Sequence, residues 1–366
     1  MDVAIIGLGN MGIRYTKILM EDKTIGLNVI AITEPKDSKK DVIKDYLDDL
    51  IIYKNDDELF KGFDNNEFKC DAVIIATPHY NHIKCIKEAF IRGLHVLCEK
   101  PIGVVLKDTK DLFKYNKNNL LCGFILQHRT FSINKYLLEL LKNKEYGDVI
   151  RISFISTDWF RTNQYFLNDG WRGNYKTDGG GLLMNQCPHY LDLICFLFGL
   201  PKKVRSYASY GRFHNIEVED EITSYLEWEN GINGTFVASS GDAYGINRLE
   251  ITTSKALITV YPDHIDINTS EHDSSYYIKE CIDKSDIKYI NKRINFEYDK
   301  SQVEVLRRFA NKDLVCDFND ALKSLYLANA MYLSSFKNKD VILYDIGTKE
   351  EELFEEEFIE ELNKRK

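Results

Sequence analysis

The sequence has no apolar run long enough to cross a membrane and no excess of positive charge. A transmembrane helix needs about 20 consecutive, mostly apolar residues, so we expect no membrane partner. The 48 basic residues are outnumbered by 57 acidic residues, which leaves a formal net charge of −9 over 366 residues. Because nucleic-acid-binding proteins usually present a basic face, the sequence gives no reason to expect a nucleic-acid partner.

Cysteine pairs are also missing, because none of the eight cysteines stands in a C-x-x-C arrangement. This argues against a disulfide framework and against a structural zinc site. His79, His82 and Cys85 are spaced like metal ligands on a helix, but no second pair of ligands follows them. We therefore expect the start of a helix here and no bound metal.

A cleavable leader is not evident either. The first strand-like run begins at Asp2 and Val3, which leaves no room for a charged region and an apolar region ahead of it. A secretory signal needs both, so we expect a cytoplasmic protein.

The first 123 residues alternate strand-like and helix-like patterns. The apolar run DVAII is followed by a glycine turn, by IRYTKILME with helical period, and by a second apolar run, LNVIAIT. Further strands are expected at 72–76 and 95–98, separated by a helix, and near the end of this part. Alternating β and α segments at this spacing predict a Rossmann domain, which is a doubly wound parallel sheet, over 1–123.

The pattern changes after residue 123. Polar and apolar residues alternate in several segments that are joined by short turns, which predicts an open, mostly antiparallel sheet with one solvated or partner-facing side. The expected strands lie within 148–160, 202–213, 220–240, 248–262 and 264–270, with helices near 180–198 and 318–336. We interpret 124–345 as an α+β domain for substrate binding and oligomerisation. The tail, 346–366, is expected to be a docked helix with Phe354, Phe358 and Leu362 on one side.

A G-x-G-x-x-G motif spans residues 7–12 (Gly7, Leu8, Gly9, Asn10, Met11 and Gly12). Gly7 permits a tight turn, Gly9 lets a pyrophosphate approach backbone N–H groups at a helix N-terminus, and Gly12 allows the helix to lie against the strand. The motif alone is weak, but here it follows a strand and opens a helix. We therefore predict a dinucleotide cofactor bound at Gly7, Gly9, Asn10, Met11 and Gly12.

Glu34 ends the second strand, 22 residues after Gly12. A carboxylate at this place accepts hydrogen bonds from the adenosine ribose hydroxyls and repels a 2′-phosphate, which favours NAD over NADP. Lys36, Lys39 and Lys40 follow closely and can offset one negative charge. NAD is the expected cofactor, with NADP as the alternative.

The strands of such a sheet point their carboxyl ends at the cofactor. Two strand ends carry polar residues and prolines, and we expect the cofactor to contact Ala76, Thr77, Pro78, His82, Glu99, Lys100 and, after the last strand, Gln127. An ammonium group at Lys100 can bond the nicotinamide ribose, hold a substrate hydroxyl and stabilise alkoxide charge. The alternative is a solvated lysine paired with Glu99.

Taken in order, GLGNMG, ATPHYNH, EKP, GWRGNYKTDGGGLLMNQCPHYLDLICFLFG and DALKSLYLANAMYLSSFKNKDV resemble the glucose–fructose oxidoreductase and inositol dehydrogenase (Gfo/Idh/MocA) family of NAD(P)-dependent oxidoreductases. The likeness covers residues 1 to 345. It implies a Rossmann domain, a C-terminal domain whose open sheet serves oligomerisation, and a catalytic or substrate-orienting lysine in the EKP motif, which is Lys100 here.

Asn185 and His189 are four residues apart, so a helix would project both from one face. Pro188 should kink that helix just before the histidine. A neutral imidazole suits removal of a hydroxyl proton, so His189 is the candidate base and Asn185 an orienting group. A buried histidine with only a structural role is the alternative. The resembling family often has aspartate at the position of Asn185, which leaves open how Lys100 and His189 divide the chemistry.

Three further residues are candidates for binding the substrate together with Lys100, Asn185 and His189: they are Arg129, Trp171 and Arg172. An aromatic face can stack on a sugar ring, and a guanidinium can bond hydroxyls, a phosphate or a carboxylate. Arg161 and Tyr165 in the same loop are weaker candidates, and all of these residues could instead support packing.

The resulting hypothesis is a dehydrogenase acting on a CH–OH group, which transfers a hydride between nicotinamide and a ring hydroxyl of a sugar, an inositol or a sugar derivative. We expect a homodimer or homotetramer, because the alternating strands leave one sheet face to be covered. Two alternatives stay open: a regulator that senses NAD(P) or a sugar without turnover, and a redox-neutral, NAD-dependent enzyme that processes glycosides.

Overall fold

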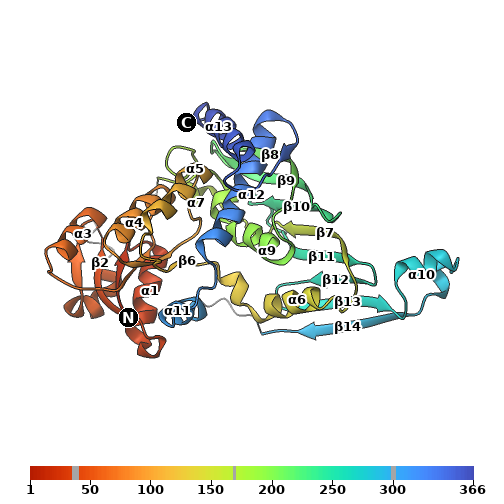
Figure 1. The fold of residues 1–366 in the computed structure, drawn as a ribbon, viewed down its shortest axis with the longest axis horizontal. Coiled ribbons are helices and arrows are strands. Elements are labelled where there is room, and N and C mark those ends of the chain that lie inside the picture. Colours follow the sequence, from red (N-terminus) through yellow and green to blue (C-terminus); the bar gives the residue numbers. More distant parts are fainter. Residues whose placement is uncertain (35–40, 168–169, 298–301) are drawn as a thin grey trace. The chain divides into compact units, whose positions relative to one another are not determined.

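The computed structural model describes residues 1–34, 41–167, 170–297 and 302–366 (Figure 1). The chain forms two compact units. The first consists of 1–127, 177–179 and 301–325, and the second of 128–176, 180–300 and 326–366, as far as these residues are described. The segments 177–179 and 301–325 therefore return to the first unit. Lys36, Lys39 and Lys40 lie outside the described residues.

The first unit contains the expected parallel sheet. Its described strands are β1 (Asp2–Ile6), β2 (Asn28–Thr33), β3 (Ile51–Tyr53), β4 (Ala72–Ile75), β5 (His95–Cys98) and β6 (Cys122–Phe124). All neighbours pair in parallel, in the order β3-β2-β1-β4-β5-β6. This order reverses direction between β1 and β4, the place where a doubly wound sheet binds its ligand.

Helices follow these strands as the alternating pattern predicts. The first unit has α1 (Asn10–Glu21), α3 (Asp56–Asp64), α4 (His79–Ile91), α5 (Leu106–Lys110), α11 (Val303–Ala310) and the start of α12 (Phe318–Lys337), with 3₁₀ turns η1 (Lys23–Ile25), η2 (Asp41–Asp49), η3 (Asp111–Tyr115) and η4 (Gln127–Thr130). Every residue of β4 is buried, and so is all of β1 after its first residue. Burial on both faces is typical of a parallel sheet between helices.

The second unit is built on a broad sheet. Its described strands are β7 (Val149–Ser156), β8 (Lys203–Tyr210), β9 (Glu219–Glu227), β10 (Asn233–Ser239), β11 (Asn247–Thr253), β12 (Ala256–Val260), β13 (His264–Ser270), β14 (Tyr289–Asn295) and β15 (Val341–Ile342). Their order is β14-β13-β12-β11-β7-β10-β9-β8-β15, and the β10–β7 pair is parallel whereas the other neighbours are antiparallel. The sheet is therefore mostly antiparallel, as expected.

Two helices of this unit contact one face of the sheet. The second unit contains α6 (Ser132–Lys142), α7 (Asn163–Leu167), α8 (Leu182–Asn185), α9 (Pro188–Phe198), α10 (Ser274–Lys279), the 3₁₀ turn η5 (Lys284–Asp286), the end of α12 and α13 (Lys349–Asn363). The ring of Tyr190 on α9 contacts Phe154 on β7 at 5.1 Å, and Ser334 on α12 accepts the N–H of Ser206 on β8. Burial alternates along β9 and β12, so the opposite face is more exposed.

The segment that was expected to be one helix near 180–198 consists of two. α8 ends at Asn185 and α9 begins at Pro188, so Gln186 and Cys187 form the break. Proline is favourable in the first turn of a helix, where its missing N–H costs no hydrogen bond. The predicted irregularity before His189 is confirmed, but Asn185 and His189 are not on one continuous helix.

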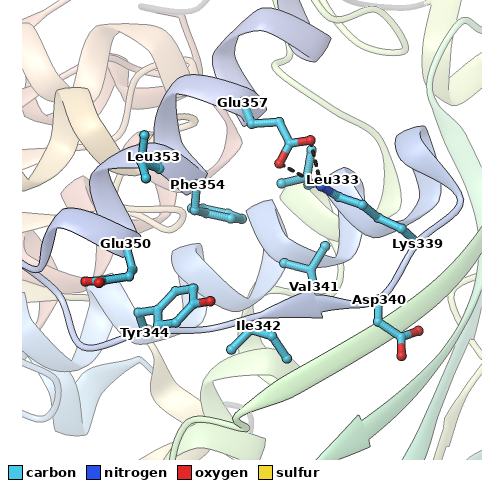
Figure 2. A pocket seen from close by; sticks show the side chains of 10 residues that line it. All are labelled: Leu333, Lys339, Asp340, Val341, Ile342, Tyr344, Glu350, Leu353, Phe354 and Glu357. Carbon is cyan, nitrogen blue, oxygen red and sulfur yellow. Dashed lines mark hydrogen bonds and ion pairs between the residues drawn. The ribbon is translucent and has the colours of Figure 1, made fainter.

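The C-terminal tail is helical and docked on its own unit, as expected. Phe354, Phe358 and Leu362 on α13 are all buried. Figure 2 shows the shallow pocket at this junction, where Phe354 of α13 lies near Leu333 of α12 and Lys339 binds Glu357 with N–O distances of 2.7 and 2.8 Å. Within the described ranges, no helix combines the length and the apolar content that a membrane crossing requires.

Candidate active site

The glycine turn connects β1 to α1 and lies against the end of β4. Gly7 has a φ of +94°, and a Cβ there would come within 2.8 Å of the Ala76 carbonyl oxygen. At Gly12 a Cβ would lie 1.8 Å from the Gly7 carbonyl oxygen. Both positions exclude a side chain, whereas a Cβ at Gly9 would meet nothing closer than 3.9 Å. At Gly9 the missing side chain leaves space beside the backbone. At Gly7 and Gly12 only glycine fits against the neighbouring carbonyl groups.

The N-terminus of α1 fits the pyrophosphate of a dinucleotide. Gly9 precedes the helix, and no side chain caps its first turn. Asn10 is exposed and Met11 is half-buried at the first two positions. Uncapped N–H groups together with the helix dipole favour a bound anion. Gly9, Asn10 and Met11 stand at this helix start, and their contacts with the cofactor remain predictions.

Glu34 lies directly after β2, and its backbone N–H donates to the Tyr53 carbonyl at 3.0 Å. The side chain is 3% exposed. The neighbouring Thr33 hydroxyl accepts the N–H of Gly7 at 2.8 Å, which ties the end of β2 to the glycine turn. Glu34, which is expected to bind the adenosine ribose, therefore follows the end of the strand that contacts the glycine turn.

The end of β4 provides a second group that could bind a polar ligand. The Thr77 hydroxyl is buried and makes no hydrogen bond with any described residue. A buried polar atom of this kind calls for a partner that the protein itself does not provide. Pro78 then starts α4 as its N-cap residue. Ala76, Thr77 and Pro78 thus stand beside the glycine turn, as the parallel topology predicts.

Glu99 is engaged inside the protein. Its carboxylate accepts a short hydrogen bond from the Tyr15 hydroxyl on α1 and a second one, at 3.1 Å, from the Lys100 N–H. Burial raises the pKa of Glu99 and that of Tyr15. Glu99 thus joins α1 to the end of β5, and its contact with the cofactor remains a prediction.

His82 also holds backbone in place. Its Nδ1 lies 2.8 Å from the Pro101 carbonyl oxygen and its Nε2 lies 2.9 Å from that of Thr77. The ring is fully buried, and burial lowers its pKa. His82 thereby connects the segment after β4 to the one after β5, where the Lys100–Pro101 peptide is cis and Lys100 is half-buried. His82 thus helps to fix this loop, and its contact with the cofactor remains a prediction.

His79 and Cys85 do not form a metal site with His82. His79 Nδ1 lies 2.9 Å from the carbonyl oxygen and 3.3 Å from a carboxylate oxygen of buried Asp178. Cys85 Sγ lies 3.8 Å from the Asp56 carboxylate. Among the residues that the structure describes, no three histidine, cysteine or acidic side chains are grouped to hold an ion.

The second unit carries His189 in the first turn of α9. Its ring stacks on that of His128 with a centroid distance of 4.7 Å and an angle of 19°. Desolvation lowers the pKa of His128 to about 4, so that neighbour is neutral at neutral pH. His189 is 8% exposed, and half-buried Asn185 closes α8 on the other side of the break. Gln127, the remaining predicted cofactor contact, is half-buried at the end of the first unit.

Arg129, a predicted substrate contact, forms an ion pair inside its own unit. Its Nε and Nη2 atoms donate to the two carboxylate oxygens of Asp192 on α9 at 2.8 and 2.6 Å. Arg129 is 5% exposed and Asp192 is fully buried, and the guanidinium also lies 4.6 Å from the Phe196 ring centroid. This fork joins Arg129 to α9, and its predicted contact with the substrate remains a prediction.

Sequence reasoning missed several partners and underrated one loop. Asp192, three residues after His189, gave a weak signal as an acid inside an apolar helix. Asp178, Tyr15 and His128 gave none, since their partners are distant in sequence. Trp171 and Arg172 lie in a loop where Arg172 is 4.6 Å from the rings of both Trp171 and Tyr165. Tyr165, on α7, was only a weaker candidate, although the guanidinium groups of both Arg161 and Arg172 lie over its ring.

Comparisons with known proteins agree with this architecture. Residues 1–124 match the model of an oxidoreductase family with an NAD-binding Rossmann fold, and residues 135–259 match the GFO/IDH/MocA C-terminal domain. The WlbA dehydrogenase of Chromobacterium violaceum, solved with NADH and UDP-GlcNAcA, has the same fold with a TM-score of 0.77 at 22% identity, covering 94% of this chain and 96% of that one. Levoglucosan dehydrogenase, solved with NADH and levoglucosan, gives a TM-score of 0.74 at 16% identity over 93% and 99%.

Curated relatives match over a shorter length. An uncharacterized oxidoreductase of Schizosaccharomyces pombe is 30% identical over 54% of this chain and 52% of its own. The 2,7-anhydro-N-acetylneuraminate hydratase of Mediterraneibacter gnavus is 25% identical over 62% and 60%. The chain thus spans about half to three-fifths of the length of these relatives. With both family models matched in order, the chain belongs to the Gfo/Idh/MocA family of oxidoreductases and its N-terminal domain is an NAD-binding Rossmann fold.

Proposed function

We propose that the protein is an NAD-dependent dehydrogenase or reductase that acts on a ring hydroxyl of a sugar, an inositol or a sugar derivative. The observation that carries the proposal is the strand-end geometry of the first unit. An open helix N-terminus and an unbonded Thr77 hydroxyl fit a dinucleotide, and Lys100 follows the neighbouring strand. The relatives whose names state a substrate act on sugar derivatives or on a cyclic diol, which supports this choice.

The proposed chemistry separates a hydride from a proton. Bound NAD supplies the acceptor for the hydride that leaves the carbinol carbon. Lys100 holds the substrate oxygen and stabilises its developing negative charge, while His189 takes the hydroxyl proton. Asn185 orients the substrate by hydrogen bonding. Gly7, Gly9, Asn10, Met11, Gly12, Glu34, Ala76, Thr77, Pro78 and Gln127 are the proposed cofactor contacts.

The test is reduction of NAD by a broad panel of cyclic polyols, followed by absorbance of NADH, with NADP in parallel. We expect Lys100→Ala to lower kcat by roughly 10²-fold, as when a group aimed at a developing oxyanion is removed. NAD affinity should change little because the glycine turn and Glu34 are intact. Lys107→Ala, at an exposed position on α5, is the matched control and should retain full turnover.

His189→Ala separates the base from the orienting lysine. If imidazole removes the proton, the loss of kcat should be smaller at high pH, where hydroxide can replace it. Near-normal turnover of this variant at all pH values would instead make Lys100 the base. NAD binding without NADH formation from any polyol would contradict the dehydrogenase proposal.

A redox-neutral reaction is a second candidate because two relatives are named as hydratases. In such a reaction a hydride is removed and returned within one turnover, so product forms without net NADH. Mass analysis of the sugar after incubation with catalytic NAD distinguishes it from a dehydrogenase. Product with stoichiometric NADH would exclude it.

A further inference from the structure

Five residues of the second unit form a stack in which cations alternate with aromatic rings. The guanidinium carbon of Arg161 lies 5.4 Å from the ring centroid of Trp159 and 4.9 Å from that of Tyr165. The guanidinium carbon of Arg172 lies 4.6 Å from Tyr165 and 4.6 Å from Trp171. We call Trp159, Arg161, Tyr165, Trp171 and Arg172 the arginine–aromatic cluster. Two positive charges therefore share one tyrosine ring.

Arg161 differs from other arginines of this chain in its partners. Arg92, Arg293 and Arg308 each direct two nitrogens at one carboxylate, with distances between 2.6 and 3.0 Å. Arg161 forms no ion pair with any described carboxylate. Its Nη1 donates to the Phe160 carbonyl oxygen at 3.0 Å, whereas its Nε is buried and makes no hydrogen bond within the described chain. A buried donor without a partner indicates a missing ligand.

Stacking leaves the donors of a guanidinium available. Its N–H bonds lie in the plane of the group, so rings above or below that plane do not use them. An anion in the plane can then form two parallel hydrogen bonds, which is the arrangement preferred by carboxylate and phosphate. The rings also exclude water, which strengthens such an interaction. The cluster thus has the chemistry of an anion site with aromatic walls.

The backbone of Arg161 is held on both sides. Its N–H donates to the Ser240 carbonyl at 2.8 Å, and its own carbonyl oxygen lies 2.9 Å from His214 Nε2. His214 Nδ1 lies 3.0 Å from the carboxylate of Asp220, which is fully buried on β9. This fixed geometry reduces the cost of ordering the loop when a ligand binds.

The cluster contacts the segment that carries Asn185 and His189. The Tyr165 hydroxyl accepts a hydrogen bond from Gln186 Nε2 at 3.3 Å, and Gln186 lies in the break between α8 and α9. The Trp159 ring lies 6.0 Å from that of Tyr190, the residue after His189. A group bound at the cluster would therefore belong to the same ligand as one bound at His189.

We propose that the arginine–aromatic cluster selects a sugar derivative that carries an anionic group, either a carboxylate or a phosphate. Arg161 would bind this group, and Trp159 or Trp171 would stack on the ring that bears it. This inference rests on the proposed function and names the substrate class of the same site.

The test compares three ligands that differ only at C6: methyl α-D-glucoside, the corresponding uronic acid and the corresponding 6-phosphate, with galacto and manno epimers of each. Binding to the full-length protein with saturating NADH is measured by calorimetry, and turnover with NAD by absorbance. We expect one anionic series to bind at least 10-fold more tightly than the neutral series. Its identity tells whether the group is a carboxylate or a phosphate.

Arg161→Gln should weaken the favoured anionic ligand by at least 10-fold and the neutral ligands by less than 2-fold. Arg161→Lys keeps the charge without the planar fork and should give an intermediate loss. Arg212→Gln is the matched control, because Arg212 is exposed and its guanidinium also lies over an aromatic ring, Phe213, at 5.1 Å. NADH affinity and the melting temperature of each variant verify that it is folded.

Equal affinity for neutral and anionic ligands, or an equal loss for both in Arg161→Gln, would overturn the inference. Turnover of neutral polyols in that case would leave the proposed dehydrogenase intact. Conversely, arginine-dependent binding of an anionic sugar with no turnover would support the inference and contradict the dehydrogenase. Failure of all ligands to bind would contradict both.

Discussion

At the scale of single residues, the cofactor end of the first unit depends on which side chains are already bonded within the protein. Glu99 and His82 are both buried and hydrogen-bonded, to Tyr15 and to backbone carbonyls respectively. Thr77 presents a hydroxyl without such a bond. At these strand ends, Glu99 and His82 stabilise the loops, whereas the Thr77 hydroxyl is available to bind a ligand.

Glu34 is expected to set the choice between NAD and NADP. Glu34→Ala removes the carboxylate that repels a 2′-phosphate, so kcat/KM for NADP relative to NAD should rise, by roughly 10-fold for the loss of one such charge contact. Steady-state kinetics with each cofactor measure the ratio. The control is Asp22→Ala, since Asp22 is at the far end of α1. An unchanged ratio would place the discrimination in another residue.

Glu219 gives a prediction about pH. Its carboxylate accepts N–H groups of Gly181 and Leu183 at the start of α8 and the Tyr332 hydroxyl. These bonds favour the charged form, but complete burial outweighs them and raises the pKa of Glu219 to about 7 from 4.5. Between these values the folded state holds a proton that the unfolded state has lost. The contribution of Glu219 to stability therefore falls as pH rises from 4.5 through 7.

Glu219→Gln cannot titrate and should lose this dependence. Between pH 5 and pH 8, the free energy of unfolding of the natural protein should fall by a few kcal/mol relative to that of the variant, since one pKa unit corresponds to about 1.4 kcal/mol. Urea unfolding at both pH values measures the difference. Parallel pH profiles of the two proteins would show that Glu219 stays ionised when buried.

Single residues were predictable from the sequence where their environment is local. The glycine turn, Glu34 and the residues after β4 are fixed by the strand that precedes them. The bond between Arg129 and Asp192 was not foreseen, because the two residues are 63 positions apart and spacing cannot show such a contact. For the same reason the sequence did not show that Glu99 is bonded to Tyr15, which is 84 residues away.

At the scale of secondary-structure elements, strands with alternating burial were predicted well, whereas exposed or short ones were missed. β9 and β12 bury every second residue and follow the expected pattern. β14 is mostly exposed along its length and has no such alternation. β14 is held by backbone pairing with β13. Its side-chain pattern therefore gives little indication of a strand.

Docking of α13 is expected to contribute to stability. Phe358 is 1% exposed and its ring is parallel to that of Phe354 at 6.3 Å. Phe358→Ala leaves a cavity under the helix and should lower the free energy of unfolding by roughly 3–5 kcal/mol. Leu353→Ala, on the same helix at 55% exposure, should cost much less. Urea unfolding midpoints compare the two, and equal shifts would mean that α13 does not unfold together with its unit.

At the scale of the whole molecule, the sequence predicted the fold class but not how the chain divides. Both sheets have the expected topology, because strand and helix periods are local signals. The return of 177–179 and 301–325 to the first unit depends on tertiary contacts. One such contact is the pairing of His79 with Asp178, two residues 99 positions apart.

The open face of the second sheet leads to the final prediction, which concerns assembly. Strand register places Tyr207, Thr223, Val237 and Ile155 in one row across four neighbouring strands. Tyr207 is 60% exposed in the single chain. A row of apolar and β-branched side chains on an exposed face is suited to pack against a second sheet. We therefore expect at least a dimer at micromolar concentration.

Val237→Glu tests whether this row is the interface. On a solvated face the new carboxylate should have little effect on stability. Inside an interface the free energy needed to desolvate it should dissociate the oligomer. Sedimentation velocity should show the monomer for this variant and the oligomer for both the natural protein and Ile91→Glu, a control at the 57% exposed end of α4. A natural protein that sediments as a monomer would contradict assembly itself. A dimer that buried this row could not accommodate an unpaired carboxylate there. If the Val237→Glu variant remains oligomeric, the interface must therefore lie on another surface.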